Sequence, residues 1–244
     1  MTDYLLIALL SVGASFVERT TGFGFGIFIM TVLPFLMPSY GEATTLSGLL
    51  ALTTTLIICS RMWKLIIWKH LWPILITFIV VSGGAVYMLS RMQLRSLTMS
   101  LGIILILISI YFLTLGGKIR IKPTVKAQII TGSLSGLMGG FFGMQGPPAV
   151  LYFISSEKDK DHYMAIISMY FCLGNLAMTF FRAGSGFLTL SVCKAYVAGI
   201  AGVFLGTYIG TKVFERIPAQ VFRYVVYAYI GICGIIILQL CNNQ

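Results

Sequence analysis

Six stretches of the chain are apolar over the length that a helix needs to cross a lipid bilayer. A membrane-spanning helix takes about 20 mostly apolar residues, and these stretches run for 17 to 24 residues each. They cover residues 44–60, 68–90, 96–115, 162–181, 190–213 and 221–240. The pattern therefore predicts six full crossings, all of them helical.

Two further apolar stretches are shorter and run into glycine-rich segments. As a helix, residues 4–17 would be about 21 Å long, which is less than the hydrocarbon core of about 30 Å. The polar and glycine-rich residues 18–26 follow, and then a second short apolar run, 27–37. The same order recurs later, in residues 127–138, 139–148 and 149–154. We therefore expect a half-helix, a glycine-rich break and a second half-helix to occur twice.

Matching basic residues indicate that the chain is an internal duplication. Lys69 and Lys194 lie 125 residues apart at corresponding ends of apolar stretches, and so do Arg91 and Arg216. We expect two transmembrane repeats that are joined by a basic linker. The repeats cover residues 1–115 and 126–244, and the linker covers residues 116–125.

The distribution of basic loop residues predicts the topology. If each glycine-broken stretch returns to its own side, the loop lysines and arginines divide 12 against 4, whereas full crossings divide them 9 against 7. The minority of four is Arg91, Arg95, Arg182 and Lys194. Because cytoplasmic loops carry the excess of basic residues, the first arrangement is favoured. It gives an all-α polytopic membrane protein of two inverted repeats with both termini outside. Each repeat is then a glycine-broken hairpin, re-entrant or discontinuous, plus three transmembrane helices.

Composition supports this class and excludes others. The chain is 58% hydrophobic and 10% charged, whereas soluble domains are about 45–50% apolar and about 25% charged. Its net charge of +10 is spread over short loops, where basic residues set topology and meet anionic headgroups. We therefore expect a lipid bilayer, and no nucleic acid, around the chain. His70 and His162 have no second ligand at metal-binding spacing, so we expect no metal and no other cofactor. A homo-oligomer is left open. No motif of a hydrolase or nucleotide-binding enzyme occurs, so we expect a protein that is not an enzyme.

The two glycine-rich breaks are the candidate site for a small anion. Irregular backbone at membrane depth is tolerated where it lines a cavity, and paired broken helices mark binding sites in transporters. Glycine lets the backbone approach a ligand, and free N–H groups at helix N-termini attract anions. Tight helix packing is the alternative role of such glycines. The candidate residues of the breaks are Thr20, Thr21, Gly22, Gly24, Gly26, Gly140, Gly143, Gln145 and Gly146.

Glu18 and Arg19 form a charged pair inside the first broken stretch. Ionisable residues at membrane depth are costly and are usually functional. We expect Arg19 to attract the anionic substrate, and Glu18 to mask that charge or to carry a coupled proton. An internal salt bridge or a position at the membrane interface is the alternative. Asn175 is a further polar candidate, although a lone asparagine in a crossing helix more often bonds a neighbouring helix.

The two breaks resemble a known signature. Thr21-Gly22-Phe23-Gly24-Phe25-Gly26 precedes Pro34, and Gly136-Leu-Met-Gly139-Gly140-Phe-Phe-Gly143-Met-Gln-Gly146-Pro147 follows about 120 residues later. This arrangement is similar to the duplicated glycine-rich signature of the TauE/SafE family of sulfite and organosulfonate exporters. The resemblance implies export of small sulfur oxyanions or sulfonates across the plasma membrane without ATP hydrolysis. Phe23 and Phe25 separate glycines that are contiguous in the commoner pattern of the family.

These observations favour a secondary transporter that exports sulfite or an organosulfonate such as sulfoacetate by alternating access. An anion-selective channel and a carrier for a small carboxylate remain as alternatives. A membrane insertase is a weaker alternative, because such a protein needs long cytoplasmic segments and the loops here span only a few residues.

Overall fold

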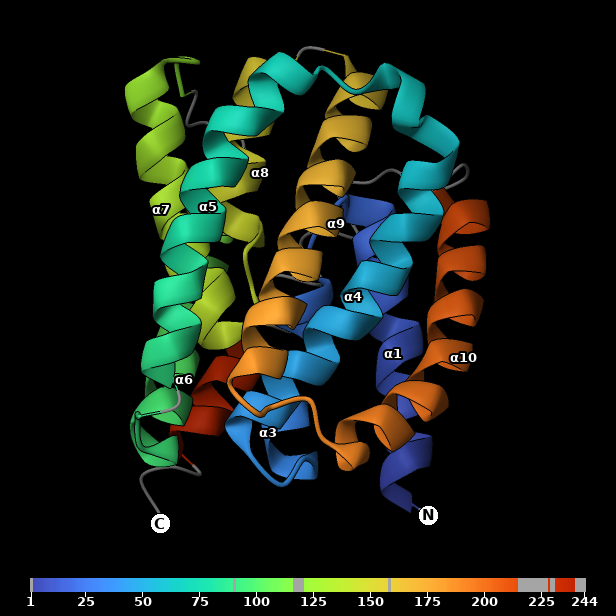
Figure 1. Ribbon diagram of the computed structural model, residues 1–244. Coiled ribbons are helices and arrows are strands. Elements are labelled where there is room, and N and C mark those ends of the chain that lie inside the picture. The colour runs from blue at the N-terminus through green and yellow to red at the C-terminus, as the bar shows by residue number, and fades with distance from the viewer. Residues whose placement is uncertain are drawn as a thin grey trace.

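The structure is a computed structural model that describes residues 2–89, 91–115, 121–157, 159–214, 228 and 231–239, and its regular structure there is helical (Figure 1). The first half contains α1 (Thr2–Thr21), α2 (Phe25–Ile29), α3 (Leu33–Leu36), α4 (Tyr40–Met62), η1 (Trp63–Leu65), α5 (Trp68–Leu89) and α6 (Leu94–Leu115). The second half contains α7 (Val125–Phe142), α8 (Gly146–Ser156), α9 (Lys160–Gly184), α10 (Leu190–Phe214) and the helical residues 231–239.

Five of these helices, α1, α4, α5, α9 and α10, are long and apolar enough to cross a membrane. The all-α membrane class is therefore confirmed, and four of the six predicted crossings coincide with α4, α5, α9 and α10. The predicted crossing 96–115 falls in α6, whose apolar part is the shorter segment Arg95–Tyr111. Half of the predicted crossing 221–240 lies outside the described residues.

The first broken stretch begins with a longer helix than the sequence predicted. α1 continues through Glu18 and Arg19 to Thr21. The hydroxyl groups of Thr20 and Thr21 donate to the carbonyls of Phe16 and Val17, four residues earlier, at 2.8 and 2.9 Å. Because these polar side chains are satisfied within α1, the polar run extends the helix, and the expected 14-residue half-helix is wrong.

The second break is also shorter than predicted. Gly139 and Gly140 belong to α7, which ends at Phe142. A Cβ atom on Gly140 would lie 2.5 Å from Cβ of Ala85 in α5. Glycine at this position therefore permits close helix packing, and the break itself is confined to residues 143–145.

Two outer pairs of helices flank a central crossing of α4 with α9 (Figure 1). In one outer pair α1 packs on α10, where Cβ atoms on Gly202 and Gly206 would lie 2.2 Å from the carbonyl oxygens of Ala8 and Val12. In the other pair Gly132, Gly136 and Gly140 of α7 approach α5 at the same four-residue spacing. Small residues four apart let helix backbones approach closely. Contacting residue numbers rise together in both pairs, so the helices of each pair run parallel.

Both broken stretches fold back toward the end of the bundle where they begin. After α1, the chain returns through α2 and α3, and α4 begins where a Cβ atom on Gly41 would meet the ring of Phe187, just before α10, at 2.2 Å. Since α1 and α10 begin side by side, we call this the α1 end of the bundle. It lies at the bottom of Figure 1.

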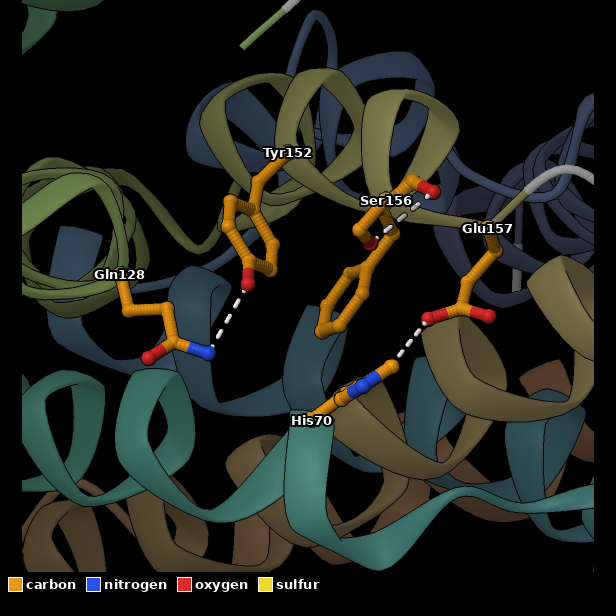
Figure 2. A network of polar contacts seen from close by, with 6 residues as sticks. His70, Gln128, Tyr152, Ser156 and Glu157 are labelled. Carbon is orange, nitrogen blue, oxygen red and sulfur yellow. Dashed lines mark hydrogen bonds and ion pairs between the residues drawn. The ribbon is translucent and has the colours of Figure 1, made fainter. Parts of the chain in front are cut away.

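The second stretch returns in the same way to the opposite end, which we call the α7 end. Gln128 near the start of α7 donates through Nε2 to the hydroxyl of Tyr152 in α8 at 2.8 Å. Glu157, just after α8, pairs with His70 at the start of α5 at 2.7 Å (Figure 2). These contacts place the end of α8 beside the starts of α5 and α7.

Candidate functional site

Both breaks rely on glycines in the left-handed region of backbone space. Gly22 has a φ of 82° and Gly24 a φ of 107° in the first break, and Gly143 has a φ of 69° in the second. Residues with a Cβ atom rarely adopt these values. The breaks therefore depend on glycine at these three positions.

The two breaks meet inside the bundle. A Cβ atom on Gly26 would lie 2.1 Å from the carbonyl oxygen of Gly143, so only hydrogen at this position permits the contact. A cavity of about 20 Å³ adjoins this contact. We call this cavity the junction. Its lining residues come from both halves of the chain. They are Glu18, Gly24, Phe25, Gly26, Ile27, Ala51, Gly143, Met144, Gln145, Gly146, Phe171 and Asn175.

The volume of the junction limits what it holds in this conformation. A cavity of 20 Å³ has room for about one water molecule. An oxyanion of four or more heavy atoms is larger, so the two breaks must move apart to admit one.

The junction offers fewer backbone donors than the sequence argument assumed. Pro147 and Pro148 occupy the first turn of α8, and proline has no N–H group. α2 is only five residues long. An anion at the junction therefore depends on charged and polar side chains more than on helix N-termini.

Glu18 is the ionisable residue among those that line the junction. Its side chain is 3% exposed, and its Oε2 atom has no hydrogen-bond partner. Gln145 and Asn175 lie beside it in the same lining. Gln145 donates weakly through Nε2 to the carbonyl of Phe171 at 3.4 Å, and its Oε1 atom has no partner.

Arg19 lies elsewhere. Its Nε atom donates to the hydroxyl of Thr211 in α10 at 3.0 Å. It lines a second cavity, of about 520 Å³, together with Lys212 and with Met62 at the end of α4. We call this the terminal cavity, because it lies where α1, α4 and α10 end. The predicted site of Glu18 and Arg19 is therefore divided between two cavities.

Of the other residues predicted for the site, some line the junction and some lie elsewhere. Gly24, Gly26, Gly143, Gln145 and Gly146 meet at the junction. Thr20 bonds within α1, and the Thr21 hydroxyl bonds both α1 and the backbone of Phe23 in the first break. Gly140 packs on α5, and Gly22 faces Met164 and Tyr163 of α9.

Arg182 is a buried cation that the sequence argument counted as a loop residue. Its side chain is 0% exposed. Nη1 donates to the carbonyl of Thr44 in α4 at 2.8 Å, and Nη2 donates to that of Gly139 in α7, also at 2.8 Å. Its position seven residues after Asn175, two helical turns along α9, was the available sequence signal.

Comparisons with known proteins agree with the sequence pattern. The model of the family described as sulfite exporter TauE/SafE matches residues 7–237. A probable sulfite/organosulfonate exporter TauE of Cupriavidus necator is 25% identical over 217 residues, which are 85% of this chain and 82% of that protein. No solved structure matches the chain.

Proposed function

The chain belongs to the sulfite exporter TauE/SafE family, and on that premise we propose that it exports sulfite or a small organosulfonate by alternating access. It is a multi-pass integral protein of the plasma membrane. The observation that carries the proposal is the junction, where glycine-rich breaks from both halves of the chain meet around polar side chains. Broken helices that meet inside the bundle are the usual substrate site of secondary transporters.

We propose that the two halves are inverted repeats that move against each other. Matching contacts support this division, because α1 packs on α10 as α7 packs on α5, and α4 packs on α10 as α9 packs on α5. α1 and α7 begin at opposite ends of the bundle, which is what inversion requires. In this proposal the contact of Gly26 with Gly143 opens and closes during transport.

The proposed orientation places the α7 end in the cytoplasm. Arg182 is buried and no longer counts as a loop charge, so the division of basic loop residues becomes 12 against 3. The terminal cavity then opens at the cytoplasmic end, where Arg19 and Lys212 supply two positive charges. These charges attract anions toward the protein, and Glu18 carries a proton at the junction.

A binding screen on the purified protein tests the proposed substrate class. A ligand at about 100 times its Kd stabilises the folded protein by about 2.7 kcal/mol. We expect sulfite or sulfoacetate to raise the melting temperature, and chloride and acetate at equal ionic strength to leave it unchanged. Stabilisation by acetate and by no sulfur anion would favour the carboxylate carrier instead.

A further inference from the structure

Arg182 is a buried positive charge without a carboxylate partner among the described residues. Among the described residues, the salt bridge joins His70 to Glu157 at the α7 end, whereas Arg182 lies near the end of α9, at the α1 end. A buried charge is costly unless an opposite charge and hydrogen bonds compensate it. The carbonyl groups of Thr44 and Gly139 supply hydrogen bonds, but they supply no net negative charge.

The guanidinium group also has N–H donors beyond those that bond Thr44 and Gly139. Arginine has five N–H donors, and two are used by the two carbonyl groups. The Nε atom is buried and has no hydrogen-bond partner. An oxyanion fits this requirement, because the planar guanidinium binds two oxygens of a carboxylate, phosphate or similar group at once.

Arg182 lies next to the junction, toward the α1 end. A Cβ atom on Gly48 would be 3.0 Å from Nη1 of Arg182 and 4.0 Å from Oδ1 of Asn175, which lines the junction. A Cβ atom on Gly143 would be 3.7 Å from the hydroxyl of Ser47, and this buried hydroxyl has no hydrogen-bond partner. Arg182, Ser47 and Gln145 thus carry unpartnered polar atoms. Gln145 lines the junction, and Arg182 and Ser47 lie close to residues of its lining.

We propose that Arg182 is the fixed positive charge that binds the transported oxyanion. The bound anion contacts Nε of Arg182 and the hydroxyl of Ser47 once the two breaks have moved apart. This inference deepens the proposed function and rests on it for the identity of the anion as a sulfur oxyanion. It assigns Arg182 the role that the sequence argument gave to Arg19.

The test compares Arg182→Gln with Arg91→Gln in an equilibrium binding assay with sulfite, sulfoacetate and acetate. Arg91 is exposed, lies at the α1 end and donates to the hydroxyl of Tyr87, so its replacement removes one positive charge from the same end of the molecule. A hydrogen bond to a charged group is worth about 1.5–3 kcal/mol. We therefore expect Arg182→Gln to raise the Kd of sulfite at least about tenfold, and Arg91→Gln to change it less than about twofold.

A second pair of variants tests whether Arg182 binds the anion if Arg182→Gln does not fold. Gly48→Ala places a methyl group 3.0 Å from Nη1 and displaces the guanidinium without removing its charge, whereas Gly84→Ala points into open space. We expect Gly48→Ala to weaken sulfite binding, with a lower melting temperature where the bonds to Thr44 and Gly139 lengthen, and Gly84→Ala to change neither the Kd nor the melting temperature. A lower melting temperature of Gly48→Ala with an unchanged Kd would overturn the inference, because Arg182 would then only join α4 to α7.

The outcomes separate this inference from the proposed function. Wild-type affinity for sulfite in Arg182→Gln overturns the Arg182 site and leaves the exporter proposal in place. Binding of acetate alone, lost in Arg182→Gln, supports the Arg182 site and contradicts the proposed substrate class. A wild-type protein that binds none of the three anions overturns both.

Discussion

The position of Glu18 favours one of the two roles expected for this residue. Masking of Arg19, one of its two expected roles, requires the two side chains to share a site, but Glu18 lines the junction and Arg19 lines the terminal cavity. The second role, as carrier of a coupled proton, suits a buried carboxyl group with an unpartnered oxygen beside the proposed substrate path. Intramembrane carboxyl groups commonly serve as proton relays.

The variant Glu18→Gln tests this role. The amide has nearly the shape of the carboxyl group but does not exchange a proton, so we expect sulfite binding to persist and its accumulation under a pH gradient to disappear. The measurement is sulfite uptake into vesicles with and without an imposed gradient. Asp3→Asn, which changes an exposed acid at the start of α1, is the control. A gradient response of Glu18→Gln equal to that of the wild type would leave Glu18 with a structural role.

Among the helical elements, the sequence predicts the positions of the two breaks better than the ends of the helices that flank them. Gly22, Gly24 and Gly143 were identifiable because a left-handed backbone requires glycine. The ends of α1 and α7 were not, because the hydroxyl bonds of Thr20 and the packing of Gly140 on α5 depend on neighbours that the local sequence does not show.

Arg182 was missed for a similar reason. It lies two residues before the end of α9, where an arginine normally reaches solvent. Its burial depends on the carbonyl groups of Thr44 and Gly139, which belong to α4 and α7. The sequence places Arg182 on the same helical face as Asn175, but it does not show these tertiary contacts.

Replacement of a glycine in a long packed helix is expected to lower stability, whereas replacement of a glycine at the junction is expected to stop transport. Gly206→Val forces a side chain onto the carbonyl of Val12, now 2.2 Å from a Cβ position, along the α1 and α10 pair. Overpacking of this kind costs about 1–3 kcal/mol, so we expect a lower melting temperature.

Gly26→Ala holds the two breaks apart at Gly143, and α2 is short enough to shift, so we expect a folded protein that does not transport sulfite.

Thermal unfolding and sulfite transport are measured together on both variants, with Gly84→Ala as the control. Normal transport by Gly26→Ala would show that the contact between the breaks has no part in the cycle. A wild-type melting temperature for Gly206→Val would remove close α1–α10 packing as a source of stability.

For the whole molecule, the proposed orientation places the two ends of the bundle on opposite sides of the membrane. Gly184, at the end of α9, is exposed and lies at the α1 end, whereas Lys122 is exposed beside the end of α8, where the Ile121 amide donates to Ser155. In a background without native cysteines, we expect Gly184→Cys to react with an impermeant thiol reagent in intact cells. Lys122→Cys should react only after the cells are opened. Labelling of both positions from outside would contradict the inverted arrangement.

Sulfite counterflow in proteoliposomes tests the central claim most directly. A carrier that alternates between two openings exchanges sulfite across the membrane faster than it produces net transport of sulfite. Vesicles loaded with unlabelled sulfite are diluted into a trace of labelled sulfite. The account predicts transient accumulation of label that saturates with sulfite concentration and is absent from vesicles carrying Gly26→Ala. Flux that neither saturates nor responds to internal sulfite would identify a channel and contradict alternating access at the junction.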